Sequence, residues 1–479
     1  MIVASIAEPA PDRVLARMDE AKRAGADVAE VRADFLERPE LGEILARKTL
    51  PAIVTARASW EGGRWRGNED DRIALLRTAA LGGADYVDVE FKAYKDFERG
   101  KAALIVSYHD FEKTPEKLES IAQKMAALDP AAIKIACLAR GAADLARLVE
   151  LQKNLPRPGA VVAMGEAGEA LRVMYARYGG MMTYASIGEA TAPGQLPVGE
   201  LVQAYRVKSV DDGTKVYAVV GDPVAHSRGP RVFNRVFHEL GINARYVRVR
   251  LDDGALFRDV AAALELSGAS VTVPHKEAVA ARLDEADEAA KAIGAVNTVT
   301  VLEGRFIGTN TDAPAAAEAI REAAKRKWSH GVYGMRALVL GAGGAARAIA
   351  WALRAEGARV IVANRTFDRA KALAEELRGE YVAWDRLIEA RAQVVVNATS
   401  VGLGTDESPF PRELWKKDAV ALDCVYVPRA TRFLREAREA GAETADGVEM
   451  YLRQANLQLQ QWIGRGMPTE LLKEFRATL

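Results

Sequence analysis

A glycine-rich turn deep in the chain limits what this sequence can fold into. The residues Gly341-Ala-Gly343-Gly-Ala-Ala346 follow the apolar run Ala337–Leu340 and precede a helix-forming segment. This order of strand, glycine turn and helix is typical of a dinucleotide-binding βαβ unit, because the glycines allow a tight turn and a close approach of the backbone to a pyrophosphate. Such turns are common, so the pattern alone is weak evidence. Because it starts only at Gly341 of a 479-residue chain, another domain must precede it.

The next expected strand indicates which nucleotide the unit would bind. The apolar run Arg359–Ala363 ends in Asn364-Arg365-Thr366, and Arg369 follows. An NAD site usually carries an acidic residue about 20 residues after the glycines, where it holds the ribose hydroxyls. Arg365 instead suits a 2′-phosphate through charge-assisted hydrogen bonds. We therefore predict an NADP-dependent oxidoreductase, and the alternative is a surface arginine on a loop.

The composition narrows the class of protein. A chain of 479 residues predicts two to four domains, and 49% hydrophobic with 28% charged residues is typical of a globular protein. Lys plus Arg and Asp plus Glu both number 66, so no net positive charge favours nucleic acid or an anionic membrane surface. No signal peptide or membrane span is expected. The cysteines Cys137 and Cys424 are expected to be reduced, in a cytoplasmic protein.

The first 190 or so residues alternate short apolar runs with charged helical segments. Eight such β units at this spacing predict a closed (β/α)8 barrel. The expected strands are Ile2–Ile6, Val28–Val31, Ala52–Thr55, Tyr86–Val89, Leu104–Tyr108, Ala132–Ile135, Ala160–Ala163 and Met182–Ser186. The polar stretch Tyr205–Lys215 is predicted to be a linker.

A two-lobed α/β module is expected after this linker, so the fold class is α/β throughout. A first lobe would contain strands near 216–220, 246–249, 270–273 and 298–301, and a helix over 315–327 would lead into a Rossmann lobe with strands near 394–397 and 419–425. A last helix near Met450–Gly464 could pack back onto the first lobe. The predicted domains are 1–208 for the barrel, 209–315 with 450–479 for a substrate lobe, and 316–449 for the NADP-binding Rossmann lobe.

Polar residues follow the expected barrel strands at their carboxyl ends, where such barrels carry their active sites. Burial of Lys134 in the apolar strand Ala132–Ile135 should lower the pKa of its amine, which could then form a Schiff base with a ketone. His109 could act as general base, and several arginines suit a carboxylated substrate. The alternatives are a lysine that reaches out of the barrel and a histidine that is an ordinary polar residue.

The first 200 or so residues resemble the type I 3-dehydroquinate dehydratases. The matching words are Glu30-Val-Arg32-Ala-Asp34, Thr55-Ala-Arg57, Glu61-Gly-Gly63, Ser107-Tyr-His109-Asp-Phe111, Lys134-Ile-Ala136, Met164-Gly165 with Arg172, and Ala192-Pro-Gly-Gln195. The resemblance implies that Lys134 forms the imine, that His109 transfers protons and that Glu61 orients His109. The residues that it implies for substrate binding are Ser5, Glu30, Arg32, Arg57, Arg172, Thr191 and Gln195. Thr191 and Leu171 stand where the family usually has Ser.

Four turns of the expected first lobe carry polar residues. Gly221-Asp-Pro-Val-Ala-His-Ser227 offers a hydroxyl, Val271-Thr-Val-Pro-His-Lys276 ends in a lysine, Gly294-Ala-Val-Asn297 adds an amide, and Gly308-Thr-Asn-Thr-Asp312 adds a carboxylate. A Lys276–Asp312 pair beside a nicotinamide could pass a proton to an oxygen as hydride reaches the carbon. The alternative is an exposed ion pair of little energetic value.

The remaining 265 or so residues resemble the shikimate dehydrogenases. Further matching words are Asn397-Ala-Thr399-Ser-Val-Gly402, Asp423-Cys-Val-Tyr426-Val-Pro428 with Thr431, and Gly447-Val-Glu-Met450 with Gln454. The resemblance implies a catalytic Lys276–Asp312 dyad. It implies substrate binding by Ser227, Thr272, Asn297, Tyr426 and Gln454. It implies NADP binding by Gly341, Ala342, Gly343, Gly344, Ala345, Asn364, Arg365, Thr366, Arg369, Thr399 and Gly447.

One residue departs from the second family. Gly229 stands where a second Ser is usual, which removes a hydroxyl and should open space for the extra hydroxyl of quinate. Quinate therefore stays an alternative substrate, as does a plain loss of affinity for shikimate.

The two resemblances fit one pathway, because the first reaction makes the ketone that the second reduces. We expect a bifunctional enzyme that takes 3-dehydroquinate through 3-dehydroshikimate to shikimate, without a metal, a nucleic acid or a membrane partner. A catabolic quinate oxidoreductase and a catalytically silent binding protein are the rivals, and the oligomeric state is not predicted.

Overall fold

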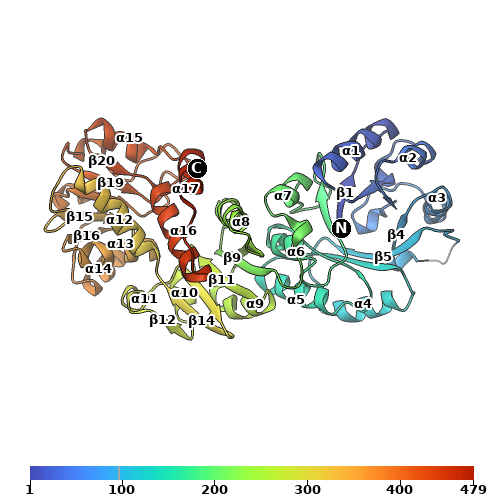
Figure 1. The fold of residues 1–479 in the computed structure, drawn as a ribbon, viewed down its shortest axis with the longest axis horizontal. Helices are drawn as coiled ribbons and strands as arrows, with labels where there is room; N and C mark the ends of the chain where they lie inside the picture. The colour runs from blue at the N-terminus through green and yellow to red at the C-terminus, as the bar shows by residue number, and fades with distance from the viewer. Residues whose placement is uncertain (95–97) are drawn as a thin grey trace. The chain divides into compact units, whose positions relative to one another are not determined.

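The computed structural model describes residues 1–94 and 98–479. The chain forms two compact units, Met1–Leu266 and Ser267–Leu479 (Figure 1). Both are built from parallel or mixed sheets with helices, as predicted for an α/β protein.

Eight parallel strands form the barrel of the first unit. Their order is β7-β6-β5-β4-β3-β2-β1-β8, and the end strands β7 and β8 lie in contact, so the sheet is nearly closed. All eight predicted strands are present. They are β1 (Ile2–Ile6), β2 (Val28–Arg32), β3 (Ala52–Thr55), β4 (Tyr86–Glu90), β5 (Ala103–Asp110), β6 (Ala132–Leu138), β7 (Gly159–Met164) and β8 (Thr183–Ser186).

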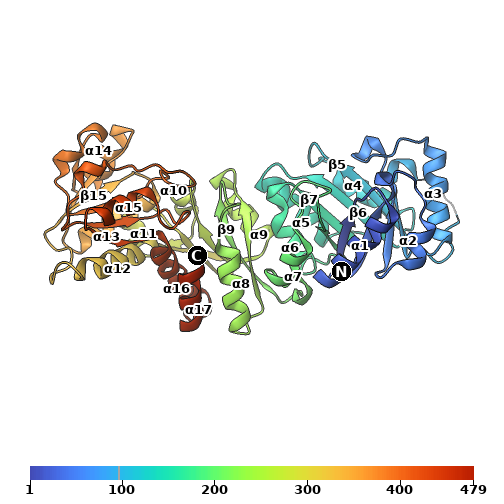
Figure 2. The ribbon, with the colours of Figure 1, turned by 90° about the horizontal axis from the view of Figure 1, so that it is seen from above.

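Helices follow the barrel strands and cover them (Figures 1 and 2). The first, α1, shows why the sequence forms them: Pro11 occupies the first turn, Gly25 ends the helix in the left-handed conformation, and Val14 and Met18 are buried on one face. The barrel helices are α1 (Pro11–Ala24), α2 (Gly42–Arg47), α3 (Glu69–Leu81), α4 (Leu118–Ala126), α5 (Ala142–Lys153), α6 (Glu169–Met174) and α7 (Val198–Gln203).

The prediction of a polar linker over Tyr205–Lys215 is wrong. Tyr205 is fully buried and its hydroxyl donates to Glu169 Oε1 at 2.5 Å, while a short 3₁₀ turn covers Val207–Ser209. The charged residues of this stretch face outward, but its tyrosine and valines pack against the barrel unit. The two parallel strands β9 (Lys215–Gly221) and β10 (Ala244–Arg250) follow, with α8 (Gly229–Glu239) and α9 (Phe257–Ala263). Within this unit α5 packs on α9, and α6 packs on β10.

The second unit begins with a small mixed sheet. Strand β11 (Leu266–Val271) pairs antiparallel with β13 (Thr298–Leu302), which pairs antiparallel with β14 (Arg305–Thr309), which pairs with the short β12 (Glu285–Ala286). The β13–β14 hairpin was not predicted. Its turn residues Glu303 and Gly304 both have positive φ, at 51° and 76°, which is the requirement of a two-residue hairpin turn.

A Rossmann sheet of order β17-β16-β15-β18-β19-β20 completes the second unit. Its strands are β15 (Arg336–Leu340), β16 (Arg359–Ala363), β17 (Glu380–Tyr381), β18 (Val394–Asn397), β19 (Val420–Asp423) and β20 (Glu443–Ala445). The unit's helices are α10 (Lys276–Ala280), α11 (Glu288–Ile293), α12 (Asp312–Lys325), α13 (Gly344–Ala355), α14 (Phe367–Glu376), α15 (Arg432–Glu439), α16 (Gly447–Ile463) and α17 (Thr469–Thr478).

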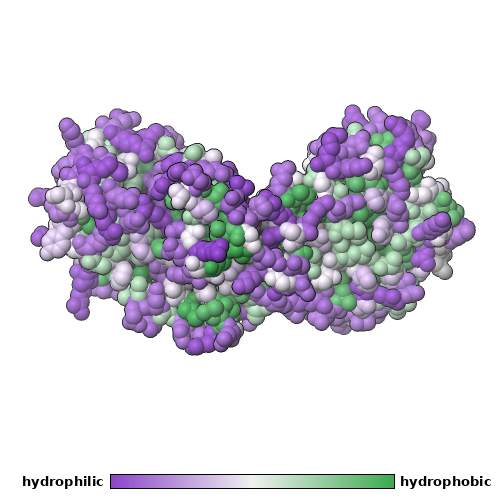
Figure 3. Space-filling model, in the orientation of Figure 1, coloured by the Kyte–Doolittle hydropathy of each residue, from purple (hydrophilic) through white to green (hydrophobic). Residues whose placement is uncertain are grey.

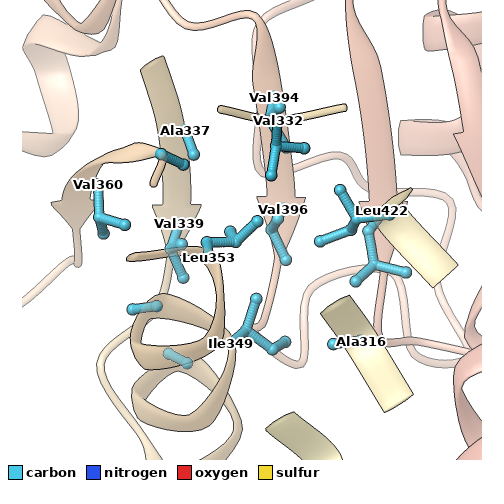
Figure 4. Packing of buried hydrophobic residues seen from close by; sticks show 14 of the residues in the cluster. Ala316, Val332, Ala337, Val339, Ile349, Leu353, Val360, Val394, Val396 and Leu422 are labelled. Atoms are coloured by element: carbon cyan, nitrogen blue, oxygen red, sulfur yellow. The ribbon is translucent and has the colours of Figure 1, made fainter. Parts of the chain in front are cut away.

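The core of the Rossmann sheet lies between strands and helices. Val339 and Val396 on the strands pack against Ile349 and Leu353 of α13 (Figure 4). The predicted final helix is present as α16 and packs on β13, where Trp462 Nε1 donates to the Val299 carbonyl at 3.1 Å. Polar residues cover most of the face drawn in Figure 3, and in residues 1–94 and 98–479 no helix is long and apolar enough to cross a membrane.

Candidate functional site

A cavity opens among the carboxyl ends of the barrel strands. Parallel strands in a barrel all end on the same face, so side chains that are distant in sequence converge there. Nine of the residues expected in the first site line the cavity: Ser5, Glu30, Arg32, Arg57, His109, Lys134, Arg172, Thr191 and Gln195. The tenth, Glu61, lies behind His109 and contacts it.

Lys134 extends from β6 into this cavity and is 6% exposed. Its Nζ atom donates to Glu30 Oε1 at 2.9 Å, lies 3.4 Å from Asp88 Oδ2, and lies 3.8 Å from the ring centroid of Tyr184. Burial, on which the sequence argument relied, is therefore only part of its environment. The two carboxylates hold the amine in one place, pointing into the cavity.

Two buried carboxylates that sequence reasoning missed support this arrangement. Asp88 and Glu90 lie on β4, and Arg57 donates to them at 2.9 and 3.0 Å. Ser107 Oγ joins Asp88 to Arg57. Burial acts to raise the pKa of Asp88, but Arg57 and Lys134 outweigh it and hold that pKa well below its usual range. The alternation Tyr-Val-Asp-Val-Glu was the available signal, since it places both carboxylates on one face of the strand.

His109 and Glu61 form a pair at the cavity wall. Glu61 Oε2 lies 3.0 Å from His109 Nδ1 and accepts the backbone N–H of His109 at 3.0 Å. Burial raises the pKa of Glu61 to about 8, and its other oxygen has no hydrogen-bond partner among the described residues. Burial, with Arg57 and Lys134 nearby, lowers the pKa of His109 well below its ordinary value. His109 therefore stays uncharged near neutral pH, as a general base must.

Arg172 lies on α6 and lines the same cavity. It is 3% exposed, and its guanidinium donates only to the carbonyls of Tyr184 and Pro193, at 3.4 and 3.2 Å. No carboxylate pairs with it among the described residues, its Nε is unpartnered, and burial lowers its pKa to about 10. A buried, uncompensated guanidinium is a binding site for an anionic group.

The other arginines of the cavity are already paired. Arg32 makes two hydrogen bonds with Asp34, at 2.9 and 2.8 Å, and Ser5 Oγ donates to Glu30 Oε2 at 2.8 Å. Thr191 and Gln195 bond to each other beside the cavity, with the Thr191 N–H donating to Gln195 Oε1 at 2.8 Å. The paired groups still offer polar atoms to the hydroxyl groups of the expected substrate. Arg172, which has no carboxylate partner among the described residues, is available for the substrate's carboxylate.

The second unit brings Lys276 and Asp312 together. Lys276 begins α10 and Asp312 begins α12, and Lys276 Nζ forms an ion pair with Asp312 Oδ2. Their side chains are 13% and 6% exposed, so the pair is not the exposed one that the sequence left open. Asn297 Nδ2 donates to Asp312 Oδ1 at 2.8 Å and lies 3.4 Å from Gln454 Oε1.

The glycine turn lies against this pair. Gly341 has φ +115°, and a Cβ there would lie 2.8 Å from the Ala398 carbonyl oxygen, so only glycine fits. A Cβ on Gly344 would lie 2.9 Å from Lys276 Cδ, so the turn and the lysine are in contact. Gly343 precedes α13 and has open space around it. The turn can therefore hold a pyrophosphate at the start of α13 with Lys276 beside it.

Most of the remaining residues expected to bind NADP follow the strands β15, β16 and β18 of the Rossmann sheet. Arg369 Nη2 reaches the Ala342 carbonyl at 3.4 Å, and Asn364 Nδ2 donates to the Thr366 carbonyl at 3.0 Å. Arg365 is exposed and has no ion pair in the described part of the chain. Ala345 is half-buried at the start of α13, and Thr399 Oγ1 donates to Asn397 Oδ1 at 2.7 Å.

Three more residues that were predicted to bind substrate or cofactor lie in the second unit. Gly447 begins α16, where a Cβ would lie 2.6 Å from the Val425 carbonyl oxygen. Tyr426 stacks on Tyr451, with ring centroids 5.4 Å apart. Thr272 is half-buried directly after β11, and its carbonyl accepts the His275 N–H at 3.0 Å.

Asp423 was missed as a possible site residue. Its carboxylate accepts from Asn397 Nδ2 at 2.8 Å and from Thr431 Oγ1 at 2.6 Å, so it joins the loops after β18 and β19. Burial raises the pKa of Asp423 to about 6. The available signal was the motif Asp423-Cys-Val-Tyr426, of which it is the first residue.

The expectation that Gly229 opens space is wrong. Gly229 begins α8, and a Cβ there would lie 2.5 Å from Cε1 and 3.2 Å from the hydroxyl oxygen of Tyr246. The Tyr246 ring, which stacks on Phe233 with centroids 4.3 Å apart, occupies the place of the absent side chain. Ser227 lies two residues earlier, where its hydroxyl accepts the Gly229 N–H at 3.2 Å.

Known proteins resemble the chain along both units. The family model of type I 3-dehydroquinase matches residues 2–212, that of the shikimate dehydrogenase substrate binding domain matches 219–299, and that of shikimate / quinate 5-dehydrogenase matches 322–403. An Arabidopsis thaliana bifunctional 3-dehydroquinate dehydratase/shikimate dehydrogenase, described as chloroplastic, is 34% identical over 98% of this chain and 83% of its own length.

Two further proteins resemble the second half. A Pyrococcus abyssi shikimate dehydrogenase (NADP(+)) is 38% identical over 54% of this chain and 96% of its own. A solved shikimate dehydrogenase from Aquifex aeolicus is 36% identical, covers 56% of this chain and 99% of its own, and superposes with a TM-score of 0.51.

Proposed function

The chain belongs to the family of bifunctional 3-dehydroquinate dehydratase/shikimate dehydrogenases, and from this premise we infer which of its residues perform the two reactions. The first part dehydrates 3-dehydroquinate to 3-dehydroshikimate, and the second reduces that ketone to shikimate with NADPH. The observation that carries the assignment is the placement of Lys134, a buried amine that faces a cavity with His109 and Arg172 on its walls.

The dehydration follows from these side chains. We propose that the Lys134 amine attacks the ketone of 3-dehydroquinate and that water leaves, giving an iminium. The iminium acidifies the neighbouring carbon, from which His109 removes a proton. His109 then returns the proton to the departing hydroxyl, and hydrolysis of the imine frees Lys134. Glu61 holds the His109 ring in place, at 3.0 Å from Nδ1.

The cavity also supplies groups for the rest of the substrate. We propose that Arg172 binds the carboxylate, with Thr191 and Gln195 beside it, because this guanidinium has no carboxylate partner among the described residues. The groups proposed for the ring hydroxyls are Ser5, Glu30, Arg32 and Arg57.

The second reaction uses the Lys276–Asp312 pair. We propose that Lys276 gives a proton to the ketone oxygen while Asp312 orients the ammonium group and balances its charge. NADPH supplies the hydride when bound. The groups proposed for substrate binding are Ser227, Thr272, Asn297, Tyr426 and Gln454.

The residues around the glycine turn fit NADP. Gly341 and Gly343 leave the cradle that a pyrophosphate needs, and Arg365 is an exposed cation on the loop after β16, without an ion pair in residues 1–94 and 98–479. With them we assign Ala342, Gly344, Ala345, Asn364, Thr366, Arg369, Thr399 and Gly447 to the cofactor. The proposed domains remain 1–208, 209–315 with 450–479, and 316–449.

We retain shikimate over quinate as the substrate of the second site. The half-length relative from Pyrococcus abyssi is named a shikimate dehydrogenase, and the Tyr246 ring occupies the space that a quinate site was expected to gain at Gly229. We propose that the protein is cytoplasmic. The support for this proposal is that both cysteines, Cys137 and Cys424, are free thiols.

Trapping of the imine tests the assignment. Borohydride added with 3-dehydroquinate should reduce the imine to a stable adduct, and peptide mass spectrometry should place it on Lys134. The matched control is K153A, which removes another lysine of the barrel unit and should leave the adduct unchanged. An adduct on another lysine, or none in an enzyme that still dehydrates, contradicts the assignment.

A further inference from the structure

A half-buried arginine, Arg248, joins the turn that carries Ser227 to the barrel. Arg248 lies on β10, and its Nε and Nη2 atoms donate to the backbone carbonyl of Ser227 at 3.2 and 3.0 Å. Its Nη1 atom donates to Glu169 Oε2 at 3.0 Å. Because a guanidinium is planar, it can hold two acceptors in fixed directions at the same time.

Glu169 belongs to the barrel and accepts two hydrogen bonds from Arg248. While Oε2 takes the guanidinium, Oε1 accepts the backbone N–H of Arg248 at 3.0 Å. Tyr205 completes the contact, because its hydroxyl accepts from Arg248 Nη1 at 3.0 Å and donates to Glu169 Oε1 at 2.5 Å. The side chains of Arg248 and Glu169 are 19% and 12% exposed, so solvent screens the pair little.

The turn also has hydrogen bonds of its own. It connects β9 to α8 without regular structure, and the Ser227 N–H donates to the Val224 carbonyl at 2.9 Å. Two N–H groups on the Ser227 carbonyl fix the plane of the following peptide. The Ser227 hydroxyl belongs to the same turn, where it accepts the Gly229 N–H at 3.2 Å.

We propose that Arg248 is a positioning residue for the shikimate dehydrogenase reaction, and that Glu169 of the dehydratase barrel holds Arg248 in place. The proposal rests on the proposed function, because it takes Ser227 as a ligand of shikimate. Glu169 begins α6, the helix that also carries Arg172. One short helix of the barrel thus serves both activities, at its first residue and at its fourth.

Steady-state kinetics on the full-length chain tests the proposal. Shikimate oxidation is followed through NADPH formation in wild type, R248M, R248K and E169Q, with S227A as the reference. Loss of two charge-assisted hydrogen bonds should raise the KM for shikimate roughly tenfold in R248M, less in R248K and E169Q, and leave the KM for NADP+ within about twofold. The double variant E169Q/R248M should cost less than the two single changes combined, because both act through one contact.

The matched control is Arg245, another arginine on β10, which is buried. It donates to the carbonyls of Ala244 and Arg206, at 2.7 and 3.0 Å, and to Ser209 Oγ. R245M removes the same groups from the same strand without touching the Ser227 turn, so its KM for shikimate should match wild type. Dehydration of 3-dehydroquinate reports folding of the barrel unit and should stay within about twofold in R248M.

Two results overturn the proposal: an R248M enzyme with the wild-type KM for shikimate, or an equal rise in R245M. If R248M fails to fold, R248K decides in the same way, because its lysine keeps the charge but cannot hold both groups. A wild-type chain that does not oxidise shikimate contradicts the proposed function instead, so the two failures are distinguishable.

Discussion

At the scale of single residues, the barrel site brings Lys134 and Arg57 into contact with the buried carboxylate of Asp88. Neither the burial of these side chains nor the sequence motifs alone predict this arrangement of charges. The sequence indicated Lys134, His109 and Arg172, because each breaks an apolar run or matches a motif. It did not indicate that Asp88 and Glu90 pair with Arg57, or that Arg172 lacks a carboxylate partner among the described residues, because these contacts depend on which side chains meet across the barrel. The cavity therefore follows from the motifs, while its electrostatics follows from the packing.

The pair His109–Glu61 predicts a pH dependence. The pKa of Glu61 is raised to about 8 and that of His109 is lowered. Below about pH 8, therefore, the Glu61 carboxyl is protonated and the His109 ring is neutral. That proton is donated to Nδ1, so Nε2 carries the ring hydrogen and cannot act as a base. Ionised Glu61 instead accepts from Nδ1 and frees Nε2. We expect kcat/KM for dehydration to rise as the pH rises through about 8.

The variant E61Q checks the assignment of this step. The amide does not titrate, so the rise near pH 8 should disappear from the dehydration profile. The pH profile of shikimate oxidation in the same variant serves as the control and should not change. A dehydration profile of unchanged shape in E61Q would assign the step to another group.

Gly229 predicts a change in stability. In G229A the new methyl group would meet the Tyr246 ring at 2.5 Å, and such overpacking costs about 1–3 kcal/mol. G199A is the matched control, because this glycine lies in α7 with nothing within 4 Å of the added carbon. Thermal unfolding should show a lower Tm for G229A and an equal or higher one for G199A. Equal Tm values for G229A and wild type would mean that the ring moves freely.

At the scale of elements, strands were predicted well where apolar runs end in polar residues, as in all eight barrel strands. The failures have local causes. The stretch Tyr205–Lys215 looks polar, yet Tyr205 and Val207 are buried, so averaging over the stretch hid them. The β13–β14 hairpin was missed because its Glu303-Gly304 turn was not recognised as a two-residue connection.

The loop after β16 predicts cofactor selectivity. Arg365 is exposed and free of ion pairs in the described part of the chain, which suits a 2′-phosphate. R365A should raise the KM for NADPH roughly tenfold or more and leave that for NADH nearly unchanged. R359A, at the other end of the same strand, is the control and should change neither. Equal effects of R365A on both nucleotides would contradict the assignment.

At the scale of the whole molecule, the chain combines two chemistries that share an intermediate. The sequence motifs predicted both halves and their order, and the compact units show what motifs could not. The first unit extends past the dehydratase matches to Leu266 and includes β9 and β10. Contacts such as Glu169–Arg248 hold these strands to the barrel, and no local pattern encodes a pair so distant in sequence.

The most direct test of two separate lysine sites on one chain uses the full-length variants K134M and K276M. Each is given 3-dehydroquinate and NADPH, alone and mixed, and shikimate is measured. We expect K134M to reduce added 3-dehydroshikimate but not to consume 3-dehydroquinate, and K276M to accumulate 3-dehydroshikimate. The mixture should form shikimate, because the intermediate diffuses from one chain to the other. Shikimate formed from 3-dehydroquinate by either variant alone would contradict the account.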